Sequence, residues 1–153
     1  MSLLTPMLRT SPLTDWFSDV QRVQGMLDFE AALVRAEVEC GLVPQTALNP
    51  IIESCRHEKI DFAALGQAAA SAGNLAIPLV KQLTARVKER NEAAARYVHW
   101  GATSQDAIDT GFILQLRGAL AETESLLQRL LDALARQAER HQDTVMPGRT
   151  WMQ

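Results

Sequence analysis

The chain has 153 residues, which is the size of one globular domain with a core of its own. Hydrophobic residues make up 47% and charged residues 22%, so the composition is that of a folded protein rather than a disordered one. The net charge is −3 and no basic cluster is present, so we expect no nucleic-acid partner.

The sequence disfavours several further classes of protein. No apolar stretch approaches the length of a membrane span, and the N-terminus has no continuous apolar signal segment. The two cysteines, Cys40 and Cys55, have no metal-ligand spacing and suit thiols in a reducing compartment. No P-loop or dinucleotide-binding glycine motif occurs. We therefore expect a cytoplasmic protein with no membrane contact, no metal and no cofactor.

The apolar residues recur with helical spacing, and no segment keeps the alternation of a strand. The expected fold class is all-α, with a helical domain over residues 1–103 and the start of a long-helix bundle over 104–153. Residues 1–14, which contain two prolines, are expected to form an irregular leader. Helices are predicted at about 18–40, at 44–57 with a break or restart at Asn49-Pro50, at 61–72, at 78–91, at 93–96 and at 104–142.

The last of these helices is too long for one compact domain. It would span about 60 Å, whereas a domain of about 100 residues has a radius of gyration near 13 Å. Its apolar stripe, which includes Leu116, Leu127 and Leu134, must therefore meet other long helices. We expect these helices to come from other subunits, from sequence absent here, or from both, and we expect the chain to be incomplete.

A polar turn over residues 99–106 precedes the long helix. Thr103 and Asp106 have the spacing of a capping box. The positive end of a helix and its free N–H groups favour an anion, and Ser104 and Gln105 add a hydroxyl and an amide. The residues leave two interpretations open, a helix cap alone or a cradle for a substrate carboxylate.

Three other residues have a functional and a structural interpretation each. His99 precedes the polar turn and is either a catalytic group or a packing residue. Asn74 follows Gly73 and either donates its amide to a ligand or forms an Asx turn before a helix. Arg149 follows Pro147-Gly148 and either binds a carboxylate or is solvated near the chain end.

The order of three motifs resembles the fumarase/aspartase superfamily, which includes argininosuccinate and adenylosuccinate lyases. They are residues 26–33 followed by 41–44, residues 101–110, and Gly148-Arg149-Thr150. The resemblance implies an all-helical homotetramer in which each active site is built from three subunits. It also implies a third motif with a catalytic serine and a lysine. This sequence ends before that motif, so we expect an N-terminal fragment, inactive alone, with the proton donor outside it.

The resemblance departs from the common pattern at Trp151, where many relatives have histidine. Tryptophan cannot transfer a proton near neutral pH. A carboxylate leaving group, with a pKa near 4, needs no proton, so a lactone-forming member would tolerate tryptophan here. The function implied is cofactor-free interconversion of a small polycarboxylate and its lactone. Two rival functions stay open, an adenylosuccinate-lyase-type C–N lyase and a non-catalytic helical interaction module.

The residues and the resemblance together predict two groups of site residues. His99 and Ser104 are predicted to be catalytic, and substrate binding is predicted for Thr103, Gln105, Asn74, Arg149 and Trp151. Of these, the resemblance carries over His99, Thr103 and Ser104.

Overall fold

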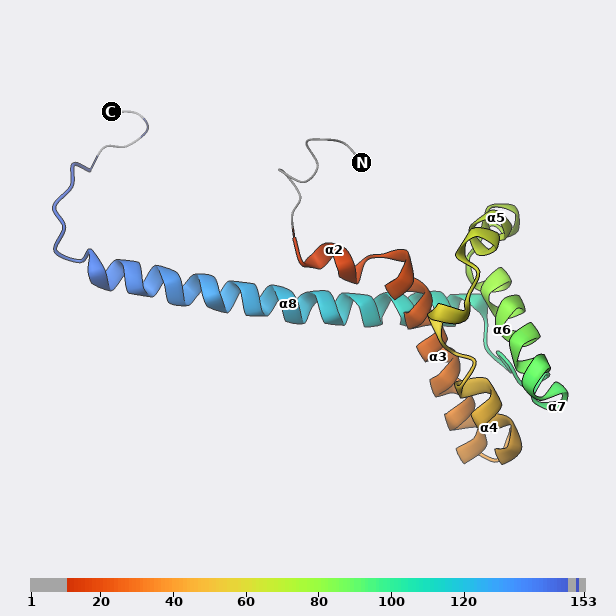
Figure 1. Ribbon diagram of the computed structural model, residues 1–153. Helices are drawn as coiled ribbons and strands as arrows, with labels where there is room; N and C mark the ends of the chain where they lie inside the picture. The colour runs from red at the N-terminus through yellow and green to blue at the C-terminus, as the bar shows by residue number, and fades with distance from the viewer. Residues whose placement is uncertain (1–10, 149–150, 152–153) are drawn as a thin grey trace.

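The computed structural model describes residues 11–148 and Trp151. This part of the chain contains helices and no strands, so the predicted all-α fold class is confirmed. Figure 1 shows α3 to α7 gathered into one body at the start of α8, while the rest of α8 projects away from it. The elements in chain order are α2 (Leu13–Trp16), α3 (Asp19–Glu39), α4 (Gln45–Ile52), the 3-10 helix η1 (His57–Lys59), α5 (Phe62–Ala72), α6 (Ala76–Arg90), α7 (Glu92–Ala95) and α8 (Ser104–Arg140).

Capping residues in the sequence set most of these boundaries. The Ser18 side chain accepts a backbone N–H from the first turn of α3 at 3.3 Å, and Asp61 caps α5 in the same way at 3.0 Å. At the end of α3, Gly41 has φ 73° and the Leu42 N–H donates to the Glu37 carbonyl at 2.8 Å. This Schellman motif needs a residue without a Cβ, so the predicted ends of α3 are confirmed.

The expected irregular leader is wrong at its last residues. Helix α2 begins at Leu13, because Pro12 has φ −61°, which is a helical value, and Trp16 packs onto α8. Residues 1–10 of the expected leader lie outside the described part of the chain.

The second predicted helix is also shorter than expected. Helix α4 ends at Ile52 rather than near His57, and it passes through Pro50 without a restart. The Ser54 hydroxyl donates to the Pro50 carbonyl at 2.7 Å, and this side-chain bond occupies a carbonyl of the last helical turn. The chain then turns, and the His57 N–H donates to the Gln24 side chain on α3 at 3.0 Å.

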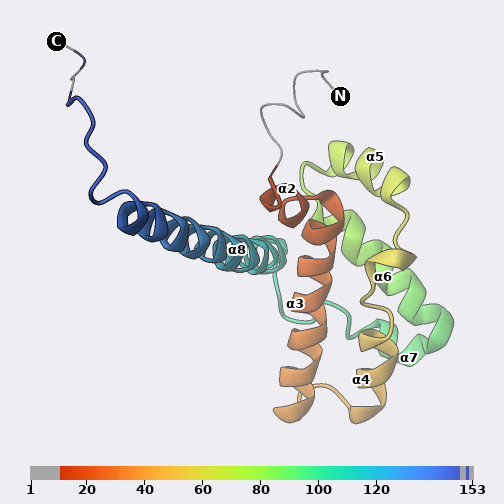
Figure 2. The same ribbon diagram turned by 60° about the vertical axis from the view of Figure 1, so that its left-hand side comes forward.

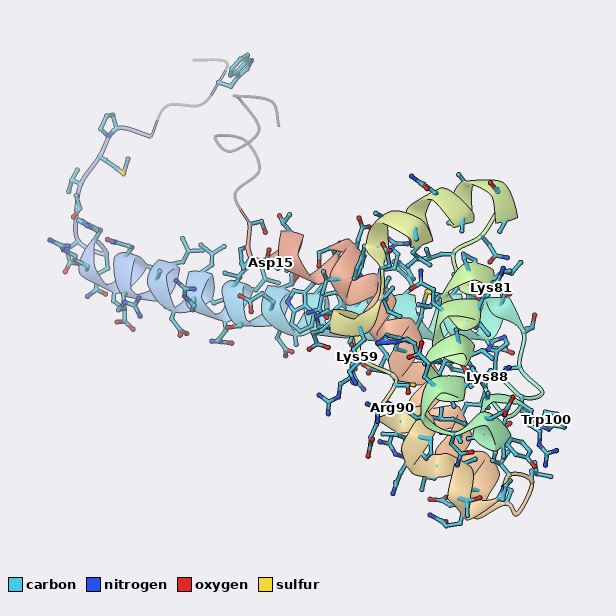
Figure 3. The ribbon with its side chains drawn as sticks, turned by 45° about the vertical axis from the view of Figure 1, so that its right-hand side comes forward. Asp15, Lys59, Lys81, Lys88, Arg90 and Trp100 are labelled. Atoms are coloured by element: carbon cyan, nitrogen blue, oxygen red, sulfur yellow. The ribbon has the colours of Figure 1, made fainter. Side chains whose placement is uncertain are left out.

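The hydrophobic core lies between α3, α4 and α6, and α7 closes one end of it. Its fully buried side chains are Val23, Leu27 and Val34 on α3, Ile51 on α4, Leu65 on α5, and Leu79, Leu83 and Val87 on α6. At the edge of this core, Arg90 (labelled in Figure 3) forms an ion pair with Glu53 at an N–O distance of 2.6 Å, which joins the ends of α6 and α4. The core therefore gives α3 a fixed position for its contact with α8.

Helix α8 crosses α3 at two glycines, Gly25 and Gly111. A Cβ added to Gly25 would lie 2.8 Å from the Gly111 carbonyl oxygen, and one added to Gly111 would lie 2.9 Å from the Met26 backbone nitrogen. The two backbones are in contact only because neither glycine has a side chain. Further along α8, Gly118 leaves the space that the Trp16 ring occupies.

The long helix is confirmed, since α8 has 37 residues and spans about 55 Å at the usual rise per residue. Figure 2 shows α8 projecting from the body, and five leucines of this helix are exposed, namely Leu120, Leu127, Leu130, Leu131 and Leu134. No helix in the described residues is both long and apolar enough to cross a membrane. The first turns of α8 pack on α3, so the division into domains at residues 103 and 104 stays a prediction.

We expect Gly111→Ala to lower the free energy of unfolding by about 1–3 kcal/mol, because the new methyl group must push two backbones apart. Gly66→Ala is the matched control, since a Cβ there meets nothing within 4 Å in the middle of α5. Alanine should raise stability at that site by about 0.5–1 kcal/mol through its helix propensity. Urea unfolding of both variants measures the difference, and equal effects would contradict the close backbone contact.

Candidate functional site

The turn between α7 and α8 carries the first predicted catalytic residue, His99. Its backbone has φ 57°, the only positive φ of a non-glycine residue in the described part of the chain, and Gly101 follows with φ 67°. The neighbouring Tyr97 and Trp100 rings contact each other with centroids 6.0 Å apart. Figure 3 shows Trp100 at the outer edge of the body, so the turn directs neighbouring side chains to different sides.

His99 is hydrogen-bonded to a buried carboxylate that the sequence did not predict. Its Nδ1 lies 2.6 Å from Oε1 of Glu30 on α3. The Glu30 residue is only 3% exposed, and the His99 side chain is 15% exposed. Burial raises the pKa of Glu30, and the facing His99 opposes that rise.

Glu37 is a second buried acid on the same face of α3. It is 7% exposed, and its Oε2 has no hydrogen-bond partner among the described residues. Burial raises the pKa of Glu37, and the charge of Glu30 raises it further, while His99 lowers it. Two shielded carboxyl groups therefore lie on this face of α3, and Glu30 is the one that is hydrogen-bonded to His99.

A signal for both acids was present in the sequence. Glu30 and Glu37 continue the three-and-four spacing of Val23, Leu27 and Val34, which are buried in the core. An acid at an apolar-face position of a helix must find a partner or take up a proton. That observation predicts a buried polar partner, although it does not predict that the partner is His99.

The polar turn forms the predicted helix start. Thr103 is the N-cap of α8 and forms a capping box with Asp106, whose carboxylate accepts the Thr103 N–H at 2.9 Å. Ser104 is half-buried, and the exposed Gln105 donates its amide to Asp109 at 2.5 Å. The backbone N–H groups of the first turn have no carbonyl one turn before them, so this end of α8 can receive an anion.

Asn74 forms an Asx turn before α6, which is its structural interpretation. Its Oδ1 accepts the Ile77 N–H at 3.0 Å. It also lines a hollow of about 230 Å³ between α3, α6 and α8. The other lining residues are Arg22, Met26, Leu75, Ile108, Phe112 and Gln115. His99, Thr103 and Ser104 do not line this hollow, so Asn74 and the polar turn do not share one cavity within the described chain.

The last two predicted substrate-binding residues are not joined to this turn. Arg149 lies outside the described residues, and Trp151 is 97% exposed. The C-terminal end of α8, which precedes both in the chain, lies at the opposite end of the helix from His99 (Figure 1). The structure therefore brings together His99, Thr103, Ser104 and Gln105 at one end of α8. Glu30 on α3 is hydrogen-bonded to the first of these.

The ionisable groups of the described residues form no cluster of three or more histidine, cysteine, aspartate or glutamate side chains suited to a metal ion. Of the two cysteines, Cys40 is exposed and Cys55 is buried. Burial and the nearby charges of Glu30 and Asp28 raise the pKa of Cys55 to about 12. The Cys55 thiol is therefore protonated at neutral pH and unsuited to nucleophilic chemistry.

Comparison with known proteins identifies the family. Residues 7–153 match the protein family described as lyase. The chain belongs to this lyase family. The match confirms the resemblance to the fumarase/aspartase superfamily that rests on the polar turn and its flanking motifs.

Several members of this family are similar to the chain over nearly all of its length. The 3-carboxy-cis,cis-muconate cycloisomerase of Pseudomonas aeruginosa is 59% identical over 143 residues, which are 94% of this chain and 31% of that protein. The crystal structure of 3-carboxy-cis,cis-muconate lactonizing enzyme from Pseudomonas putida has a TM-score of 0.95 at 52% identity, covering 99% of this chain and 35% of that one. The nitrosuccinate lyase of Streptomyces davaonensis is 40% identical over 148 residues, or 97% of this chain and 31% of that protein.

The chain spans about a third of the length of the curated relatives that it matches. The activity of the whole protein is therefore a matter for proposal and experiment.

The raised pKa of Glu37 predicts how stability changes with pH. Ionising Glu37 costs more in the folded chain than in the unfolded one. Its contribution to stability is therefore fully present below the unfolded pKa of about 4.3 and is lost as pH rises through the folded pKa. Glutamine cannot ionise, so we expect the Tm of Glu37→Gln to rise relative to the unsubstituted chain between pH 4 and pH 7.5.

The control is Glu39→Gln, which removes an exposed acid from the same helix. Thermal unfolding at several pH values measures both variants. The same pH trend in the two would contradict a special effect of burial at Glu37.

Proposed function

We propose that this chain is the N-terminal part of a cycloisomerase that interconverts 3-carboxy-cis,cis-muconate and 4-carboxymuconolactone, in the protocatechuate branch of aromatic catabolism. The observation that carries the proposal is 59% identity to a cycloisomerase of that name over 94% of the chain. The polar turn adds chemical support, because the substrate and the product are both polycarboxylates and the start of α8 suits an anion.

The reaction is an intramolecular addition that needs no cofactor. One carboxylate of the substrate adds to a double bond conjugated with another carboxylate, and the α-carbon takes up a proton. Negative charge develops on the conjugated carboxylate as the new bond forms, so fixed hydrogen-bond donors around that group lower the barrier.

The residues of this chain supply such donors in the proposed mechanism. The N-terminal turn of α8 and the hydroxyls of Thr103 and Ser104 bind one substrate carboxylate, and Gln105 borders them. His99 meets the substrate through its free ring nitrogen. The proton donor belongs to sequence outside this chain.

The remaining predicted residues require a second copy of the chain. Arg149 and Trp151 follow the far end of α8, which is separated from His99 by a helix of 37 residues, about 55 Å long. We propose a cytoplasmic homotetramer in which Arg149 and Trp151 of one copy, and Asn74 of the same or another copy, border the polar turn of a neighbour.

Trp151 favours lactone chemistry within this family. Its indole N–H only donates a hydrogen bond, and it cannot deliver a proton near neutral pH. When the lactone opens, the leaving group is a carboxylate with a pKa near 4, which departs without a proton. An amine leaving group needs one, and this argues against an adenylosuccinate-lyase-type reaction.

A second candidate function is elimination from a nitro-substituted succinate, and the 40% identity to nitrosuccinate lyase favours it. This reaction also starts from a dicarboxylate, so the anion site at α8 suits it equally. The two candidates differ in one step. In the cycloisomerase reaction a substrate carboxylate forms the ester bond of a lactone, whereas in the elimination both carboxylates stay free.

The experiment uses a full-length enzyme, meaning a protein that joins this chain to the rest of a relative's length. One such protein is the Pseudomonas aeruginosa cycloisomerase with this chain in place of its matching 143 residues. We expect loss of muconate absorbance with 3-carboxy-cis,cis-muconate and no fumarate from nitrosuccinate. The reverse result would support the second candidate, and turnover of either substrate by the 153-residue chain alone would contradict a site shared with other sequence.

The exposed leucines of α8 predict the assembly. We expect the full-length enzyme to sediment as a tetramer, and we expect the double substitution of Leu127→Glu with Leu134→Glu to dissociate it, because both residues are more than half exposed in the single chain. Arg129→Glu together with Arg136→Glu changes charge on the same stretch of α8 without removing a leucine. A monodisperse monomer of the unsubstituted enzyme would contradict the proposal.

Ser104→Ala tests the anion site. Loss of one hydrogen bond to a charged group costs about 1.5–3 kcal/mol, so we expect kcat/KM of the full-length enzyme to fall roughly tenfold to a hundredfold. Stability should change little, since the Ser104 side chain makes no hydrogen bond to the described residues.

The control for Ser104→Ala is Asp61→Ala, which removes the cap of α5 away from the polar turn. It should lower the Tm and leave kcat/KM unchanged. Unchanged kinetics in Ser104→Ala together with a lowered Tm would support the helix-cap interpretation alone.

A further inference from the structure

We infer that Glu30 is a positioning residue for His99. Its buried carboxylate accepts the Nδ1–H of the imidazole, which fixes the tautomer and leaves Nε2 as the ring nitrogen that meets a substrate. This inference rests on the proposed function in one respect, namely that His99 contacts the substrate.

The first support is the geometry of the pair. The 2.6 Å separation of His99 Nδ1 and Glu30 Oε1 is short for a nitrogen–oxygen hydrogen bond, as expected when the acceptor is ionised. His99 makes no other side-chain hydrogen bond to the described residues, so Nε2 is available. The partner of an imidazole nitrogen determines which of the two nitrogens carries the proton.

The second support is the burial of the acid. A carboxylate that is 3% exposed is strongly disfavoured unless a hydrogen-bond donor faces it. Among the described residues, His99 is the side chain that is hydrogen-bonded to Glu30. The imidazole therefore stabilises the buried carboxylate, and the carboxylate in turn orients the imidazole.

The third support is the backbone of His99. Its φ of 57° is a left-handed value that is uncommon for residues with a Cβ, although histidine adopts it more often than most. The chain tolerates this conformation at a residue whose ring then points to α3. Strain of this kind is kept where the surrounding contacts determine the conformation, and functional sites are enriched in it.

The neighbouring ionisable groups are also shielded from water. On α3 the second acid is Glu37, whose pKa is raised by burial and by Glu30. The Cys55 thiol, which follows α4, has a pKa of about 12 and stays neutral. Burial raises the pKa of Glu30 as well, and the hydrogen-bonded His99 lowers it, because the imidazole favours the charged carboxylate.

The inference is tested first by nitrogen-15 NMR of the imidazole rings, which distinguishes the two tautomers. The measurement uses the 153-residue chain itself and does not depend on catalysis. We expect the unsubstituted chain to show His99 protonated at Nδ1, with a far-downfield proton on that nitrogen. A neutral ring protonated only at Nε2 would mean that Glu30 is the donor, and it would overturn the inference.

Two variants extend the test to catalysis. Glu30→Gln should remove the downfield Nδ1 proton and lower kcat/KM of the full-length enzyme about tenfold to a hundredfold, mainly through kcat. Glu37→Gln is the matched control, because it removes another buried acid of α3 that has no hydrogen bond to His99, and it should keep both the NMR signal and kcat/KM within about threefold. Effects of equal size in the two variants would overturn the inference.

The outcomes separate this inference from the proposed function. If Glu30→Gln loses the Nδ1 signal but kcat/KM is unchanged, Glu30 does not act through His99 and the inference fails. If the unsubstituted full-length enzyme has no cycloisomerase activity while the NMR result is as expected, the proposed function fails and the Glu30–His99 arrangement stands. Should Glu30→Gln not fold, the tautomer of the unsubstituted chain still decides the inference.

Discussion

The backbone contact between Gly25 and Gly111 sets the distance between α3, which carries Glu30, and α8, which begins at the polar turn. It lets α8 approach α3 more closely than any pair of residues with a Cβ would allow. Glu30 lies on α3 five residues after Gly25, and Ser104 lies on α8 seven residues before Gly111. A change in the distance between these helices would move the polar turn relative to the acid beneath it. The site depends on a contact in which no functional side chain takes part.

The same helix pair explains why α3 can bury two acids. A buried carboxyl group needs either a proton or a donor that comes to it, because water cannot reach it. Burial raises the pKa of both acids, but the turn before α8 brings His99 to Glu30, whereas Oε2 of Glu37 has no hydrogen-bond partner among the described residues. The acids therefore differ in their partners rather than in their burial, and this difference makes Glu37 a useful control for Glu30.

Much of the fold was predictable because its signals are local. The caps at Ser18 and Asp61, the glycine after α3 and the unbroken periodicity of α8 each act within a few residues of the chain. The errors came from contacts between distant residues. Helix α2 depends on a Trp16 ring packing against Gly118, and α4 ends where the chain turns to meet Gln24 on α3. No pattern of local spacing contains those contacts.

The candidate site likewise has one part that local spacing predicts and another that depends on contacts between distant residues. Thr103 and Asp106 were predictable as a capping box, since they are three residues apart. The partnership of His99 with Glu30 joins residues that are 69 positions apart, and only the buried face of α3 gave a sign of it. Asn74 was assigned to the ligand from a motif, and its observed contact to the Ile77 N–H is the Asx turn that the residues had left open.

The length of α8 sets a limit on what one copy of the chain can do. Its first turns are packed against α3, while most of its leucines from Leu120 onward are exposed. A straight helix of about 55 Å cannot bring Trp151 back to His99 by any local bend, because no proline interrupts it between Ser104 and Arg140. The proposed homotetramer would account for both the exposed apolar face and the distance between the two groups of candidate residues. A neighbouring copy that packs on the leucines in the opposite direction would cover them and would carry its own Trp151 toward this polar turn.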